Sequence, residues 1–177
     1  PPRSTLFPYT TLFRSNAEIL VESVERILRR LRTDHIDLWR VTAEVRGRNS
    51  EADIEAVVAA SERLKQAGKI RFLGVSSHHP GWIQQAVSQF DALQVAIVPC
   101  TPLGCGEPAP GPPPEPLRTI VAAGCGLMTI KPFAGGILFT RGRAQDPQAD
   151  THRLARLTLT HILQSRPEIA SVLTGLT

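Results

Sequence analysis

The stretch Leu64–Pro80, LKQAGKIRFLGVSSHHP, contains the end of one helix, a complete strand and the start of the next helix. Gly68 ends the preceding helical pattern, because glycine readily adopts the left-handed conformation that closes a helix. Ile70–Ser76 is a short apolar run, which is typical of a buried strand. Pro80 stands where a proline opens the first turn of a helix. The stretch therefore predicts a helix, a strand and a helix in succession.

The same alternation extends in both directions from this stretch. Apolar residues of 17–31 recur at three and four positions, the period of a helix with one buried stripe. Ile36–Thr42 predicts a buried strand, and Ser50 with Asp53 predicts the capping box of a second helix. Downstream, the sequence predicts a helix over 81–90, a strand over 92–98, a helix over 117–123, a strand over 126–132, a last helix, and a strand over 171–175.

Five strands separated by helices predict an α/β fold. Each strand is apolar on both faces, so we expect parallel strands with helices outside the sheet. A doubly wound sheet and a closed barrel both satisfy this pattern, and periodicity does not choose between them. No G-x-G-x-x-G follows a strand, which weakens the dinucleotide-binding form of the doubly wound fold.

Composition places the chain in the ordinary globular class. Its 177 residues are 42% hydrophobic and 20% charged, and 20 basic against 16 acidic residues give a net charge of +4, as expected for one domain. Four arginines within 26–32 predict a solvated helix face, and no aromatic residues interleave with them, so no nucleic-acid partner is expected. No apolar run reaches the roughly 18 residues of a membrane helix and none resembles a signal peptide, so we expect a cytoplasmic protein without a membrane partner.

The segment 100–116 contains two of the three cysteines and seven prolines. It is too long for a plain connection, so it is either a functional loop or an insertion. Cys100, Cys105 and Cys125 form no C-x2-C pair, and their odd number favours a reducing compartment over a disulfide framework. We therefore expect structural cysteines.

The first fifteen residues differ in character from the rest of the chain. Thr5–Ser15, TLFPYTTLFRS, is similar to the translation of a common sequencing adapter. A genuine strand is the alternative, because alternating Thr, Leu, Phe and Tyr favour strands. We expect residues 1–15 to be an artefact, with the natural protein read from about Asn16. Without them the net charge falls to +2, and Tyr9, the one tyrosine, is lost.

Four segments resemble, in order and spacing, successive βα units of the aldo-keto reductase family. They are SVERILRRLRTDHIDL (23–38), LKQAGKIRFLGVSSHHP (64–80), FDALQVAIVP (90–99) and GLMTIKPFAGG (126–136). The resemblance implies a (β/α)8 TIM barrel, in which residues 16–177 form the carboxyl-terminal portion of a single domain, from strand four to strand eight. Such a barrel needs about 250 residues. We therefore expect the three amino-terminal strands to be missing.

The resemblance also implies a reaction, the reduction of a small aldehyde or ketone by NADP(H), or alternatively NAD(H). In the family a tyrosine, tuned by a lysine and an aspartate, donates a proton while a histidine orients the carbonyl. The first three residues belong to the missing strands, and Thr42 occupies the position of the histidine. Threonine donates a hydrogen bond but carries no positive charge. We therefore expect an altered substrate site or a non-catalytic member, and no activity from this fragment alone.

Residues implied to bind the cofactor lie at strand ends. Ser76 and Ser77 occupy the place of a Ser-Asn pair that holds the nicotinamide carboxamide, and Gln94 is expected to complete this clamp. An amide needs both a donor and an acceptor, and a serine in place of asparagine keeps only one hydroxyl. The alternative for both serines is local turn chemistry.

The other expected cofactor residues follow the last two strands. Ile130 stands where many relatives stack a tyrosine on the nicotinamide, and Lys131, Phe133 and the following glycines belong to a loop that approaches the phosphates. Glycines let a backbone come close to a phosphate. Gly175 ends the last strand, where the family's phosphate-binding loop begins.

Other functions remain open. One alternative is an aldolase-like barrel in which Lys131 is the Schiff-base nucleophile, if burial lowers its pKa. Thr42 favours a non-catalytic NADP-binding regulator on the same fold. Some relatives carry an iron-sulfur module that would follow Thr177. The oligomeric state is not predicted.

The positions of the histidines do not predict a metal site. His78 and His79 could line the pocket, but paired histidines in such a loop are more often surface residues. His152 and His161 lie nine residues apart on the last predicted helix, a spacing that does not place two ligands on one helix face.

Overall fold

Helices and strands alternate along the chain in the computed structural model, which describes residues 16–43, 49–105 and 115–174. The described elements are α1 (Ala17–Leu31), β1 (Ile36–Thr42), α2 (Glu51–Gln66), β2 (Ile70–Ser76), α3 (Pro80–Gln89), β3 (Val95–Pro99), α4 (Glu115–Ala122), β4 (Gly126–Ile130), the 3-10 helix η1 (Ala134–Gly136), α5 (Ile137–Gln145), α6 (Thr151–Ser165) and β5 (Ile169–Leu173).

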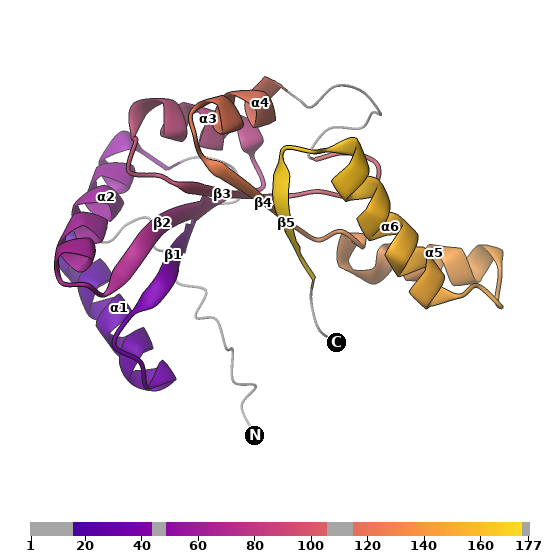
Figure 1. Ribbon diagram of the computed structural model, residues 1–177, viewed down its shortest axis with the longest axis horizontal. Helices are drawn as coiled ribbons and strands as arrows, with labels where there is room; N and C mark the ends of the chain where they lie inside the picture. Colours follow the sequence, from indigo (N-terminus) through magenta and orange to yellow (C-terminus); the bar gives the residue numbers. More distant parts are fainter. Residues whose placement is uncertain (1–15, 44–48, 106–114, 175–177) are drawn as a thin grey trace.

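The five strands form one parallel sheet in the order β1-β2-β3-β4-β5. Figure 1 shows the strands as an arc with the helices around its outer side. A doubly wound sheet would reverse its strand order at a switch point and carry helices on both faces. The α/β prediction is therefore confirmed, and the architecture is that of part of a barrel.

The helix boundaries follow from local capping. The side chain of Asn16 accepts a hydrogen bond from the Ile19 backbone N–H at 3.0 Å, which satisfies a free donor at the start of α1. Ser50 and Asp53 form the predicted capping box, since the Asp53 backbone N–H donates to Ser50 Oγ and the Ser50 backbone N–H donates to Asp53 Oδ2. Local sequence therefore sets where α1 and α2 begin.

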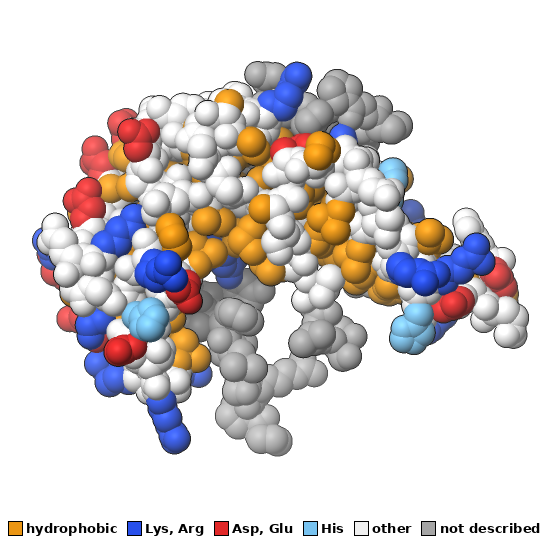
Figure 2. All heavy atoms as spheres, viewed as in Figure 1, with side chains coloured by type: hydrophobic (Ala, Val, Ile, Leu, Met, Phe, Trp, Pro, Cys, Tyr) orange, Lys and Arg blue, Asp and Glu red, His pale blue; other side chains and the backbone are white. Residues whose placement is uncertain are grey.

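The hydrophobic core lies between the outer face of the sheet and the helices. Strand residues that alternate toward the helices are buried there, among them Trp39, Val41, Leu73, Val75, Ala96 and Val98. The inner face of the arc lacks such a cover in the described part of the chain. Phe72 is 40% exposed and Leu173 is 42% exposed, and Figure 2 shows hydrophobic side chains along the open side of the arc.

Several features differ from the sequence-based expectation. β4 ends at Ile130 rather than at residue 132, and β5 spans Ile169–Leu173 rather than residues 171–175. The carboxyl-terminal region contains two α-helices rather than one, because α5 has no buried residue and hence no apolar stripe to reveal it. The third strand begins at Val95 rather than at residue 92, since a turn closed by the Leu93 N–H and the Phe90 carbonyl precedes it. Cys100 and Cys105 form a disulfide.

The disulfide corrects the expectation of a chain without disulfides. Thr101 and Gly104 exchange backbone hydrogen bonds across a tight turn, which brings the two cysteine Cα atoms to 4.0 Å. Cys125 is a buried free thiol. Spacing in the sequence did not reveal the pair, because the turn that joins it is a property of the folded backbone.

Candidate functional site

Polar side chains gather where the parallel strands end. β1 ends at Thr42, β2 at Ser76 and β4 at Ile130, directly before Lys131. The carboxyl ends of parallel strands share one edge of the sheet, the edge at which barrels place their active sites. This edge is therefore the candidate site.

Ser76 lies at the centre of a three-residue cluster. It is 3% exposed, and its Oγ accepts a hydrogen bond from Arg40 Nη1 at 2.8 Å. Arginine is only a donor, so the Ser76 proton points elsewhere, to Thr42 Oγ1 at 3.2 Å or to the Val41 carbonyl at 3.4 Å. The cluster joins Thr42 to a permanent positive charge.

Ser77 has a turn-forming role. It is 3% exposed, and its Oγ accepts a hydrogen bond from the His79 backbone N–H at 3.0 Å. Its own backbone N–H donates to the Ile97 carbonyl of β3 at 3.2 Å. The local turn chemistry considered for this serine is therefore present, and its hydroxyl proton remains available to a ligand.

Gln94 does not join the two serines. It directly precedes β3, where Gly74 pairs with Val95 and Ser76 pairs with Ile97, so it lies toward the opposite edge of the sheet. There Gln94 Oε1 accepts a hydrogen bond from Lys65 Nζ of α2 at 2.7 Å. This corrects the expected clamp: the β3 residues that pair beside the serines are apolar, and Gln94 serves the helix-sheet contact.

Lys131 crosses the candidate site toward β2. Its Nζ lies 3.0 Å from His78 Nε2, so residues that follow β2 and β4 meet above the end of β3. Burial and, to a lesser degree, the Lys131 charge hold the pKa of His78 below its ordinary value. In this contact, a neutral His78 accepts a hydrogen bond from the Lys131 ammonium group. Lys131 is exposed, unlike the buried lysine that the Schiff-base alternative requires.

The loop after β4 has unusual backbone geometry. Lys131 has φ 60° and Ala134 has φ 51°, and Gly135 and Gly136 also have positive φ. Apart from the adjacent backbone, no atom of the described residues lies within 4 Å of where a Cβ would stand on either glycine, so a ligand can approach this backbone closely. Phe133 packs on Phe139 with ring centroids 4.9 Å apart, Ile130 is partly buried on the inner face, and Gly175 lies outside the described residues.

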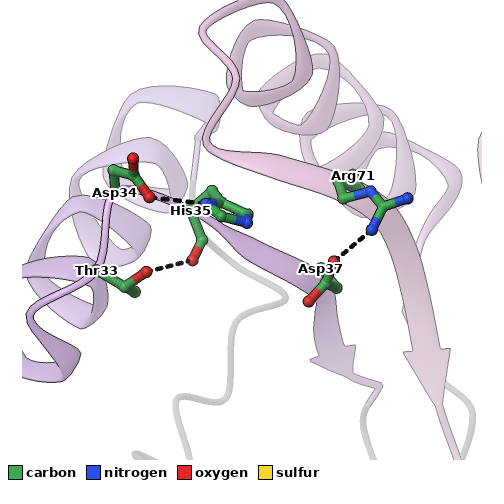
Figure 3. A network of polar contacts seen from close by, with 5 residues as sticks. All are labelled: Thr33, Asp34, His35, Asp37 and Arg71. Atoms are coloured by element: carbon green, nitrogen blue, oxygen red, sulfur yellow. Dashed lines mark hydrogen bonds and ion pairs between the residues drawn. The ribbon is translucent and has the colours of Figure 1, made fainter.

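Arg40 is the functional candidate that sequence reasoning missed. It interrupts the apolar run Ile36–Thr42, where a charged residue in a buried strand is unusual. That interruption was the available signal. The polar contacts in Figure 3, by contrast, lie near the amino-terminal ends of β1 and β2. There Arg71 Nη1 donates to Asp37 Oδ1 at 2.7 Å, and His35 contacts Asp34.

No cluster of three or more His, Cys, Asp or Glu side chains suited to a metal occurs among residues 16–43, 49–105 and 115–174. Within the same described ranges, no helix has the length and apolar character needed to cross a membrane.

Comparisons with known proteins identify a family and a fold. A model described as the aldo/keto reductase family matches residues 8–173, beginning inside the segment of residues 1–15. The uncharacterized oxidoreductase YqkF of Bacillus subtilis (strain 168) is 36% identical over 76 residues, which are 43% of this chain and 24% of that protein.

Solved structures are similar in fold. The holo form of the aldo-keto reductase AKR11C1 from Bacillus halodurans has a TM-score of 0.65 and 24% identity, covering 92% of this chain and 58% of that one. An aldo/keto reductase from Brucella melitensis has a TM-score of 0.64 and 13% identity, covering 92% and 58%. Such neighbours are TIM barrels. The chain thus spans about a quarter of the curated relative and under two thirds of these structures.

Proposed function

Because this chain belongs to the aldo/keto reductase family of oxidoreductases, we propose that it is the carboxyl-terminal part of an NADP(H)-dependent reductase of small aldehydes and ketones. The observation that carries the proposal is the shared edge at which Thr42 contacts Ser76, Ser77 follows in the same turn, and Lys131 reaches across to His78. We further propose that residues 16–177 supply strands four to eight and that residues 1–15 are foreign to the natural protein. We call the longer protein the complete reductase.

The residues at this edge fit a nicotinamide dinucleotide. The free hydroxyl proton of Ser77 suits the carboxamide oxygen, and Ile130 offers an apolar surface beside it. Lys131 and the open backbone at Gly135 and Gly136 suit the phosphates, because a cation favours anions and no Cβ blocks their approach to the glycines. The Gly136 N–H itself donates to the Phe133 carbonyl. When bound, the cofactor supplies a hydride for the carbonyl carbon.

Thr42 has the position and chemistry to orient the carbonyl. The Ser76 hydroxyl donates to Thr42 Oγ1 or to the Val41 carbonyl, and in the first arrangement the Thr42 proton points away from Ser76. A donor held at this edge stabilises negative charge that develops on the carbonyl oxygen. The proton donor itself, with its lysine and aspartate, would come from the preceding strands.

A cofactor-binding experiment tests the proposal. In the complete reductase, replacing Lys131 with Met should weaken NADPH binding about tenfold, since a charge-assisted contact is lost. Ser88→Ala, which removes an exposed α3 hydroxyl bonded to the Gln84 carbonyl, should leave binding unchanged. Fluorescence titration measures both, and equal affinity in the wild type and Lys131→Met would refute the phosphate role.

Activity measurements separate the alternatives. The complete reductase should oxidise NADPH in the presence of 4-nitrobenzaldehyde, and the 177-residue chain should not. NADPH binding without turnover by the complete reductase would favour the regulator, which Thr42 makes a specific second candidate. The amino-acid sequence of the strands that precede this chain also separates the two candidates. A regulator would lack the family's aspartate, tyrosine and lysine there, and a reductase would have them.

A further inference from the structure

Arg40 places a charge on the inner face of the arc. Along β1, Trp39 and Val41 are buried against the helices, so Leu38, Arg40 and Thr42 alternate to the opposite face. Arg40 pairs in register with Gly74, and its guanidinium extends along the strand to Ser76 Oγ. The charge therefore lies just below the edge that forms the candidate site.

No carboxylate neutralises this charge within the described ranges. The acidic partners of the ion pairs found there, Glu18, Glu25, Asp34 and Asp37, contact Arg63, Lys69, His35 and Arg71 respectively. Arg40 donates instead to the neutral hydroxyl of Ser76. A partly buried cation is costly without an anion, and a guanidinium has five N–H donors. The arrangement suits a carboxylate, which accepts two parallel hydrogen bonds from arginine.

The neighbouring hydroxyl groups reinforce this selectivity. Ser76 Oγ accepts from Arg40 and donates toward Thr42 Oγ1, so Thr42 has a proton to offer at the edge. Arg40 and Thr42 thus both present donors, and both lie within 3.2 Å of the same Ser76 oxygen. Such a pair matches a carbonyl oxygen and a carboxylate on adjacent carbon atoms.

The cofactor phosphates do not account for this charge. The groups that suit them, Lys131 and the Gly135–Gly136 backbone, follow β4, whereas Arg40 is on β1. Two strands, β2 and β3, separate these positions in the sheet. The anion at Arg40 is therefore a different group from the cofactor phosphates.

We propose that the substrates of this site are 2-oxo acids or similarly short oxo acids, and that Arg40 binds their carboxylate while Thr42 binds the carbonyl oxygen. This inference rests on the proposed reductase function and names its substrate class.

A matched substrate pair tests it in the complete reductase. Phenylglyoxylate and its methyl ester have the same reactive ketone, and only the first is an anion. The wild type should have the higher kcat/KM for the acid. Arg40→Gln should lower the acid-to-ester ratio of kcat/KM about ten- to a hundredfold, and Arg40→Lys should restore part of it. Arg71→Gln is the matched control, because Arg71 is an exposed cation on β2 bonded to Asp37 at the other edge.

A binding measurement separates this inference from the proposed function. Calorimetric titration with phenylglyoxylate and with its methyl ester, in the absence of cofactor, reports recognition without turnover. Tighter binding of the acid than of the ester, lost in Arg40→Gln, supports the carboxylate role of Arg40. If neither compound is then reduced, that absence of turnover refutes the reductase function and leaves the carboxylate role intact. Any of three results overturns the carboxylate role. The wild type could prefer the ester, Arg40→Gln could leave the acid-to-ester ratio unchanged, or Arg71→Gln could lower that ratio as much as Arg40→Gln does.

Discussion

At the scale of single residues, the notable exchange is between position 42 and position 40. Threonine at the end of β1 removes a titratable ring from the place where family resemblance expects histidine. Arg40, two residues earlier on the same face, contributes a permanent charge that reaches Ser76. Because residues two apart on a strand share a face, Arg40 and Thr42 both face the inner side of the arc.

The contact between His78 and Lys131 gives a prediction about titration. Lys131→Met should raise the pKa of His78 but leave it below its ordinary value of 6.5, because burial is the larger cause of the shift. NMR titration of the ring in the complete reductase measures this. Lys69→Met, which breaks a contact with Glu25 at the opposite end of β2 from His78, should not move the pKa. A fall of that pKa in Lys131→Met would contradict the assignment.

The same shift makes stability depend on pH. A histidine with a depressed pKa binds a proton less well in the folded than in the unfolded state, so its contribution is present above pH 6.5 and is lost as pH falls toward the folded-state pKa. Lys131→Met should make this loss smaller. Urea unfolding at several pH values in that range would show the difference.

Thiol reactivity distinguishes the three cysteines. Burial raises the pKa of Cys125 to about 11, so its thiolate is scarce and shielded near neutral pH. Iodoacetamide should therefore label Cys125 only after unfolding, and Cys100 and Cys105 only after unfolding with a reductant. Peptide mass spectrometry identifies each site. Labelling of Cys100 in the unfolded, unreduced protein would mean that the disulfide is absent in solution.

At the scale of elements, β2 depends on a close approach at Gly74. A Cβ there would lie 3.0 Å from Leu38 Cδ1 and 3.3 Å from the Val95 carbonyl oxygen. The leucine can rotate away, but the carbonyl belongs to the neighbouring strand. The glycine therefore lets β1, β2 and β3 pack at their observed spacing.

Two glycine substitutions test this packing. Gly74→Ala should lower the free energy of unfolding by about 1–3 kcal/mol, because overpacking displaces backbone. Gly126→Ala in β4 is the matched control, since its nearest atom, the Gln94 carbonyl oxygen, is at an ordinary 3.7 Å. Urea unfolding of the complete reductase measures both variants. An equal effect of the two substitutions would show that the close contact at Gly74 has no cost.

At the scale of the whole molecule, the arc exposes what a closed barrel hides. β1 and β5 are the two outermost strands of the described sheet. The unpaired backbone groups of an outermost strand promote association with other chains. Phe72 and Leu173 are exposed along the strands, and Figure 2 shows hydrophobic side chains on the open side of the arc. A barrel removes both problems by closing on itself.

We therefore expect the 177-residue chain alone to aggregate or to remain a molten fragment. Light scattering after size-exclusion chromatography should detect large species, and a hydrophobic dye should bind more strongly than to the complete reductase. A monomer with a sharp cooperative unfolding transition would contradict this expectation. The complete reductase is the control, since the preceding strands would cover these edges.

The resemblance and the patterns of the sequence anticipated most of the site's location and only part of its content. Ser76, Ser77, Thr42 and Lys131 lie at strand ends as predicted, because strand ends are marked by local changes in polarity. Gln94 also borders a strand, but at the wrong end. Apolar alternation does not report the register between neighbouring strands, and register decides which strand ends meet.

By itself, the sequence determined most of the segments that form helices and strands, with the exception of α5, and where α1 and α2 begin, because periodicity and capping act over a few residues. The tertiary structure alone decided that Arg40 reaches Ser76, that His78 meets Lys131, and that Cys100 pairs with Cys105. These contacts depend on sheet curvature, strand register and loop geometry, which arise from packing between residues distant in the chain.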